Sequence, residues 1–204
     1  MKLEVAFDDV DLARCLDILS TSAEDIDIIE VGTLFIIKEG LEPVRKIRSL
    51  YPDKTILADP KIMDAADVIA GYCYEAGADI VTVMGVSSEA TIRKVIAAAK
   101  KYGKKVFIDL LDVEDVADKF EYFDSLGADI LCIHSSKNAD RPPFEDLAAA
   151  KKVVKNSEIA IAGGINLLSI DSAAALSPDI IIAGSGIYKA DDPAAVIRAF
   201  KEHM

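Results

Sequence analysis

The feature that most constrains the fold is a regular alternation of short apolar runs with longer amphipathic segments. Eight runs have the length and composition of buried β-strands, at residues 3–7, 27–31, 55–59, 80–84, 105–109, 130–133, 159–162 and 179–183. Eight segments of helical periodicity follow them, at residues 12–22, 41–50, 65–76, 89–102, 113–126, 144–155, 168–176 and 194–202. This order predicts parallel strands joined by helices that cross over the sheet.

An internal repeat sets the spacing of these segments. The stretches Gly77-Ala78-Asp79-Ile80, Gly127-Ala128-Asp129-Ile130 and Ser177-Pro178-Asp179-Ile180 recur every 50 residues, the length of two strand–helix units. In each, Gly or Pro ends a helix and Ile begins the next buried strand. Eight such units predict a compact (β/α)8 barrel, a TIM barrel of the α/β class, formed by one domain over residues 1–204. An open, doubly wound sheet is the alternative that the same alternation permits.

The charge balance argues against two classes of partner. With 23 Lys and Arg against 35 Asp and Glu, the net charge is −12, and such a field repels nucleic acids and anionic membranes. No apolar run reaches the roughly 18 residues of a membrane span, and no signal-peptide pattern precedes the first predicted strand. Cys15, Cys73 and Cys132 lie far apart in apolar segments, as reduced thiols do. We therefore expect a cytoplasmic protein without nucleic-acid or membrane partners.

Polar side chains mark the carboxyl ends of the predicted strands. In a (β/α)8 barrel these ends form the mouth where chemistry takes place. The polar residues at these positions are Asp8, Glu30, Asp59, Lys61, Asp64, Asp109 and His134. They are the candidates for a site.

Two glycine loops follow the last two predicted strands. Gly163 and Gly164 come after the seventh, and Gly184, Ser185 and Gly186 come after the eighth. Loops at these places often bind phosphate through backbone N–H groups, and glycine allows close approach. The alternative is that these glycines only form tight turns. Because two such loops are adjacent in the predicted barrel, we expect Gly163, Gly164, Gly184 and Ser185 to bind a phosphate.

Two carboxylates are expected to meet at neighbouring strand ends. Glu30 ends the second predicted strand and Asp59 ends the third, with Lys61 close behind. Hard oxygen ligands without a His/Cys cluster suit Mg²⁺ better than zinc. The alternative is that Glu30 pairs only with Lys61.

His134 is one of two histidines, and it directly follows an apolar strand at the mouth. This position predicts an accessible proton carrier. A purely structural histidine is the alternative.

These residues together resemble the orotidine 5′-phosphate decarboxylase superfamily, within it the branch of 3-hexulose-6-phosphate synthases and 3-keto-L-gulonate-6-phosphate decarboxylases. The resemblance spans nearly the whole chain. Its carriers are Val5-Ala6-Phe7-Asp8, Asp27-Ile28-Ile29-Glu30-Val31-Gly32-Thr33, Leu57-Ala58-Asp59-Pro60-Lys61-Ile62-Met63-Asp64, Gly77-Ala78-Asp79, Ala162-Gly163-Gly164 and Asp192-Pro193-Ala194-Ala195.

The resemblance implies roles for most of the candidates. Glu30 and Asp59 would help to bind Mg²⁺, Lys61 would contact the oxygens of an enediolate, and Asp8 and His134 would complete the site. Asp64 would reach the active site of the partner subunit in an obligate homodimer.

The resemblance also separates the branches. Val83-Met84-Gly85-Val86 and Ile108-Asp109-Leu110-Leu111 look like the synthases, which join D-ribulose 5-phosphate to formaldehyde through an enediolate. The alternative is a 3-keto-L-gulonate-6-phosphate decarboxylase. A non-catalytic barrel that binds a sugar phosphate is the third hypothesis. It is motivated by a short loop after His134, by Lys137 and Ser185 where the decarboxylases carry arginines, and by the unusual Pro60.

Overall fold

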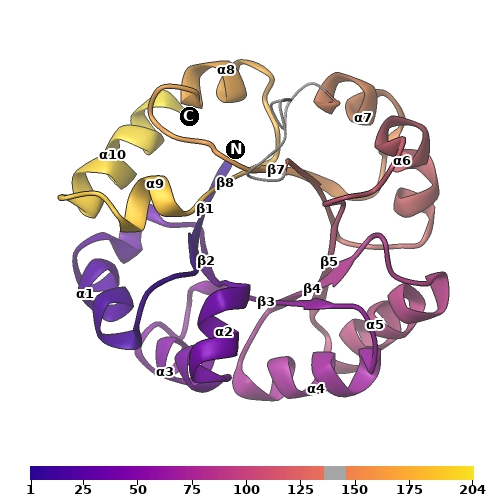
Figure 1. The fold of residues 1–204 in the computed structure, drawn as a ribbon, viewed down its shortest axis with the longest axis horizontal. Coiled ribbons are helices and arrows are strands. Elements are labelled where there is room, and N and C mark those ends of the chain that lie inside the picture. Colours follow the sequence, from indigo (N-terminus) through magenta and orange to yellow (C-terminus); the bar gives the residue numbers. More distant parts are fainter. Residues whose placement is uncertain (136–145) are drawn as a thin grey trace.

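Eight parallel strands close into a barrel in the order β1 to β8 (Figure 1). The computed structural model describes residues 1–135 and 146–204. The strands are β1 (Lys2–Phe7), β2 (Ile28–Val31), β3 (Thr55–Ile62), β4 (Ile80–Met84), β5 (Lys105–Asp109), β6 (Ile130–His134), β7 (Glu158–Ala162) and β8 (Ile180–Ala183). β1 pairs with both β2 and β8, so the predicted (β/α)8 barrel is confirmed and the open sheet is excluded.

Helices surround the barrel and connect its strands (Figure 1). They are α1 (Leu12–Ser22), η1 (Ala23–Asp25), α2 (Thr33–Glu39), α3 (Glu42–Leu50), α4 (Ala66–Ala76), α5 (Glu89–Tyr102), α6 (Val116–Ser125), α7 (Leu147–Val153), α8 (Ile170–Ala175), α9 (Ser185–Tyr188) and α10 (Pro193–His203). Each predicted helix has a counterpart, although the predicted start at residue 144 lies outside the described residues. Helices α2 and α9 were not predicted, and β3 continues beyond residue 59 to Ile62.

Short polar side chains begin several helices. Asp11, Ser88 and Asp192 accept hydrogen bonds from the backbone N–H groups of Arg14, Thr91 and Ala195, at 2.8, 3.2 and 2.9 Å. These bonds satisfy N–H groups that the first helical turn leaves without partners. Among the described residues, no helix combines the length and hydrophobicity that a bilayer span requires.

The 50-residue repeat corresponds to a recurring pair of hydrogen bonds below the barrel. An aspartate before each even-numbered strand accepts the N–H of a residue near the start of the preceding strand and donates its own N–H to the same residue's carbonyl. The pairs are Asp27 with Leu3, Asp79 with Ile56, Asp129 with Val106 and Asp179 with Ile159. The carboxylate–amide distances are 2.7, 3.0, 2.8 and 2.8 Å. Each pair fixes how two strands start side by side.

Apolar side chains fill two separate regions. A large cluster packs between the strands and the helices. A smaller one fills the lower barrel interior and consists of Ala6, Ile28, Leu57, Ile80, Phe107, Ile130, Cys132, Ala160, Ala162, Ile180 and Ile182. Because side chains alternate across a strand, the residues that follow these at the strands' carboxyl ends also face inward. This alternation positions the site.

Candidate active site

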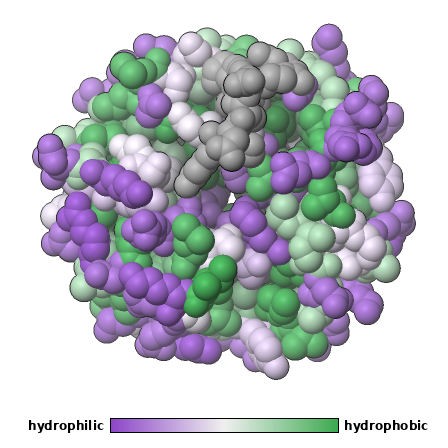
Figure 2. Space-filling view, in the orientation of Figure 1, coloured by the Kyte–Doolittle hydropathy of each residue, from purple (hydrophilic) through white to green (hydrophobic). Residues whose placement is uncertain are grey.

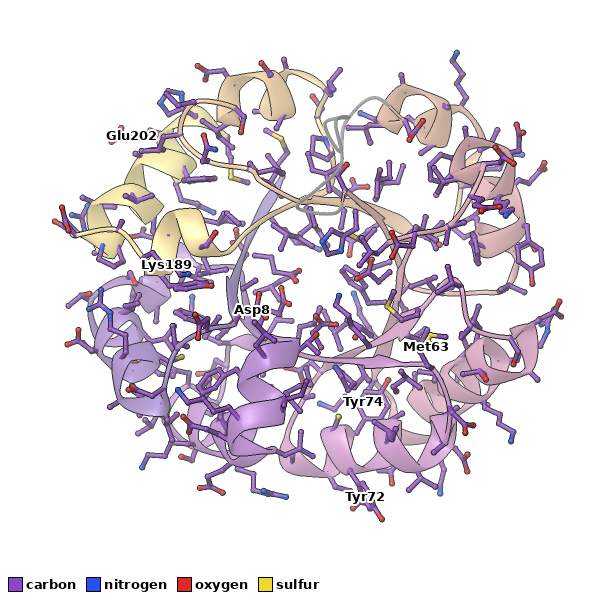
Figure 3. The ribbon with its side chains drawn as sticks, viewed as in Figure 1. Asp8, Met63, Tyr72, Tyr74, Lys189 and Glu202 are labelled. Atoms are coloured by element: carbon purple, nitrogen blue, oxygen red, sulfur yellow. The ribbon has the colours of Figure 1, made fainter. Side chains whose placement is uncertain are left out.

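A cavity of about 620 Å³ lies within the barrel and is lined by residues from all eight strands or the loops after them. Its lining includes Asp8, Glu30, Asp59, Lys61, His134, Gly163, Gly164, Gly184 and Ser185, which are all the predicted site residues except Asp64. Asp8 points toward the centre of the ring in Figure 3. The sequence therefore identified residues that the fold brings together from distant parts of the chain.

Lys61 is held between two buried carboxylates. Its Nζ lies 2.6 Å from Asp109 Oδ2 and 3.2 Å from Asp59 Oδ2. Its backbone has a φ of +47°, at a register shift in β3, and its N–H donates to Thr82 Oγ1 at 3.1 Å. Burial lowers the pKa of Lys61, but the charges of Asp59 and Asp109 outweigh burial and raise it above its usual range. Lys61 is therefore a fixed cation rather than a base.

Asp109 connects Lys61 to His134. His134 Nδ1 lies 3.1 and 3.0 Å from the two carboxylate oxygens of Asp109, and the N–H of Leu111 donates to Oδ1 at 3.0 Å. Burial opposes ionisation, but His134 and Lys61 together hold the pKa of Asp109 below its usual value. An ionised Asp109 accepts a proton on Nδ1, which leaves Nε2 of neutral His134 as the acceptor that can take a substrate proton.

Two threonines fix the carboxylate of Asp59. Thr33 Oγ1 donates to Asp59 Oδ2 at 2.9 Å and Thr82 Oγ1 donates to Oδ1 at 2.5 Å. Thr33 also donates to the backbone carbonyl of Asp59 at 2.9 Å. Asp59 is thus oriented by neighbours on both sides, as metal-binding carboxylates commonly are.

Glu30 does not form the ion pair with Lys61 that was one alternative. In the described part of the chain, the carboxylates within 4 Å of Lys61 Nζ are those of Asp59 and Asp109. Glu30 is buried, and burial followed by the charges of Glu4 and Asp59 raises its pKa well above the usual value. This carboxyl is therefore available for another cation.

Glu4, which was not predicted, lies deeper in the same cavity. It is fully buried, and neither carboxylate oxygen has a hydrogen-bond partner among the described residues. Burial, as the largest cause, raises the pKa of Glu4 to about 8, and a bond to Glu30 forms only when one of the two carboxyls carries a proton. Its position, two and four residues before the inward-facing Ala6 and Asp8, was the signal that could have identified it.

The orphaned carboxyl of Glu4 beside Glu30 fits a hard divalent cation such as Mg²⁺. Glu30 and Asp59 offer oxygen ligands to the cavity. A second group, formed by Asp109, Cys132 and His134, has potential ligand atoms within 4.8 Å of one another. It is less suitable because Lys61 already places a positive charge on Asp109.

The two glycine loops form another part of the cavity wall. Gly163 has a φ of +109°, and a Cβ at this position would lie 2.2 Å from the carbonyl oxygen of Ser135. Gly184 directly precedes α9, which starts at Ser185. Glycine is therefore required at position 163 both by its backbone angle and by close approach of the loop after His134.

Asp64 lies apart from this arrangement. It is exposed, does not line the cavity, and accepts the N–H of Ala65 at 2.7 Å. The site of a single chain therefore forms without Asp64.

Comparisons with known proteins add to this geometry. The sequence profile of the "Orotidine 5'-phosphate decarboxylase / HUMPS family" matches residues 1–200. A 3-hexulose-6-phosphate synthase of Bacillus subtilis (strain 168) is 37% identical over 205 residues, which cover 99% of this chain and 98% of the relative. The structure of 3-hexulose-6-phosphate synthase from Salmonella typhimurium has a TM-score of 0.95 and 39% identity, with 100% and 98% coverage. KGPDC from Streptococcus mutans, solved in complex with a phosphosugar, has a TM-score of 0.89 and 26% identity, with 99% and 96% coverage.

Proposed function

This chain belongs to the orotidine 5′-phosphate decarboxylase / HUMPS family, and on that premise we propose that it is a 3-hexulose-6-phosphate synthase. Such an enzyme is a carbon–carbon lyase that reversibly joins D-ribulose 5-phosphate and formaldehyde. The observation that carries the proposal is the Lys61 ammonium, held between Asp59 and Asp109 on the wall of the cavity. A fixed cation of this kind stabilises the negative charge of an enediolate.

The substrate's position follows from the two ends of the cavity. Gly163, Gly164, Gly184 and Ser185 would bind the phosphate, which directs the other end of the sugar toward Lys61 and His134. The structure of KGPDC with its phosphosugar, and that of a more distant relative with the inhibitor BMP, support a phosphorylated ligand in a site of this fold.

The reaction needs one proton carrier and one charge stabiliser. His134 Nε2 would remove a proton from the carbon next to the ketone, and Lys61 would stabilise the resulting enediolate oxygen. The enediolate carbon forms a bond to the carbon of formaldehyde, and the proton on His134 returns to the formaldehyde oxygen. Mg²⁺, held by Glu30 and Asp59, would supply further positive charge to the sugar oxygens when bound.

Replacing Lys61 tests this assignment. Because Lys61 acts on charge that develops during the reaction, Lys61→Ala should lower kcat by about 10²–10³-fold and change KM much less. The measurement is formaldehyde consumption with D-ribulose 5-phosphate and Mg²⁺. Lys94→Ala, at an exposed position on α5, is the matched control and should retain wild-type kcat.

The same assay separates the alternatives. Release of CO₂ from 3-keto-L-gulonate 6-phosphate without formaldehyde consumption would replace the synthase by the decarboxylase. Thermal stabilisation by sugar phosphates without turnover of either substrate would indicate a non-catalytic binding barrel. A Lys61→Ala variant with near-normal kcat would refute the role of Lys61.

We further propose a homodimer in which Asp64 completes the partner's site. Support comes from exposed apolar side chains near Asp64: Leu34 and Ile37 on α2, Met63 after β3, and Val68 and Tyr72 on α4. Figure 2 shows hydrophobic side chains over α2 on the face viewed down the barrel. A cytoplasmic location is supported by three free, buried cysteines, which suit a reducing compartment.

A further inference from the structure

Glu4 is a charged residue placed where the barrel is otherwise apolar. It lies on β1 among the side chains that fill the lower interior, and its exposed fraction is 0%. The inward-facing parity that places Ala6 and Asp8 on the cavity wall places Glu4 there as well. Its carboxyl is therefore directed into the cavity from below.

The register of the strands brings Glu4 under Glu30. Ala6 is the β1 partner of Glu30, and Glu4 is the partner of Ile28, so Glu4 starts one inward-facing layer lower. The glutamate side chain is long enough to reach back up toward the next layer. The mutual effect of the two carboxyls on each other's ionisation agrees with this closeness.

No cation of the described chain neutralises this pair. Lys61 forms its ion pairs with Asp59 and Asp109, and both oxygens of Glu4 lack a hydrogen-bond donor. A buried polar group without a partner requires an explanation such as an ion or a water that the protein chain does not supply. A glutamine of the same size would fit this space without a charge.

We propose that Glu4 is a third carboxylate of the divalent-cation site that Glu30 and Asp59 form, and that it holds the cation from the inner side of the barrel. This inference deepens the proposed function and depends on its cation site, but not on the identity of the substrate. The ligand class is a hard divalent cation, Mg²⁺ or Mn²⁺, because all three side chains offer oxygen.

The test is direct binding of Mn²⁺, followed by electron paramagnetic resonance of the free ion in titrations of the purified full chain. Glu4→Gln keeps the size of the side chain and removes its charge, and it should raise the Kd for Mn²⁺ by about 10–100-fold. Glu30→Gln should weaken binding at least as much. Glu202→Gln, on the outer surface at α10 (Figure 3), is the matched control and should bind like the wild type.

A second variant protects the test against misfolding. Glu4→Asp keeps the charge but withdraws the carboxyl by one methylene, and it should also weaken Mn²⁺ binding. Thermal unfolding without metal confirms that each variant folds, and the rise in Tm on adding Mn²⁺ should be smaller for both variants than for the wild type. Wild-type Mn²⁺ affinity in a folded Glu4→Gln or Glu4→Asp variant would overturn the inference, as would a wild type that binds no Mn²⁺.

Failure of this inference can be told apart from failure of the proposed function. Formaldehyde consumption by the wild type, together with unchanged Mn²⁺ affinity of Glu4→Gln, would refute the role of Glu4 alone. Weakened Mn²⁺ binding in Glu4→Gln without turnover of D-ribulose 5-phosphate would support the role of Glu4 and refute the synthase assignment.

Discussion

Asp109 shows how one residue can organise two others. Its carboxylate binds the Lys61 ammonium and faces Nδ1 of His134, so it sets both the position of a cation and the tautomer of a proton carrier. Sequence analysis placed Asp109 at a strand end, but it gave Asp109 no role of its own. Its importance depends on distances between β3, β5 and β6 that no local pattern contains.

Replacing Asp109 should separate positioning from binding. Asp109→Asn keeps the shape but removes the charge, so Lys61 loses a partner and His134 loses the acceptor for its Nδ1 proton. We expect kcat to fall by about 10²–10⁴-fold, and the pH profile of kcat to change because the tautomer of His134 is no longer fixed.

Steady-state kinetics over a range of pH are the measurement. Asp112→Asn, three residues further along the chain, is the control. An Asp109→Asn variant with wild-type kcat and pH profile would contradict this role.

At the scale of elements, the strands were predicted well because their cores are continuous apolar runs. The strands 80–84 and 105–109 have the predicted bounds. Helix α2 was missed because only Phe35 is buried in it, while Leu34 and Ile37 are exposed, so its apolar residues do not form one inward stripe. A helix that is apolar toward solvent is understandable if a second subunit covers it.

The aspartates below the barrel make a stability prediction. Burial alone would raise the pKa of Asp79, but hydrogen bonds from Lys104 and the N–H of Ile56, with the charge of Arg48, outweigh burial and lower it. An acid with a lowered pKa in the folded state stabilises the fold above its unfolded pKa, near 3.8, and loses this effect as pH falls through the lower folded value.

Asp79→Asn should therefore lower the free energy of unfolding at pH 7 by about 2 kcal/mol, and by less at pH 3. Urea denaturation at both pH values measures this difference. Asp53→Asn, in an exposed turn, is the control and should change stability little. An equal loss for Asp79→Asn at pH 7 and pH 3 would show that the charge of Asp79 is not the cause.

At the scale of the whole molecule, the position of Asp64 makes a prediction about assembly. If Asp64 completes the partner's site, Lys61→Ala and Asp64→Ala are each inactive, but a mixed dimer carries one intact site. Refolding the two variants together at equal amounts should restore about a quarter of wild-type activity, because half of the dimers are mixed and half of their sites are intact. Light scattering gives the mass of the species.

Co-refolding Lys61→Ala with itself is the control and should restore nothing. A mixture that stays inactive while light scattering shows dimers would refute the role of Asp64, and a monomer at all concentrations would refute the dimer. Asp64 could be singled out in the sequence, but its destination could not, because it depends on a second chain.

The reciprocal aspartate–amide pairs divide the ring into four quarters: β1 with β2, β3 with β4, β5 with β6, and β7 with β8. Each quarter has its own internal fastening at the base, whereas adjoining quarters are joined by ordinary strand pairing. The architecture thus carries the geometry expected of a gene built by successive duplication of a two-strand segment. For circular permutation, the seams after β2, β4 and β6 are the places where new ends leave every fastening intact.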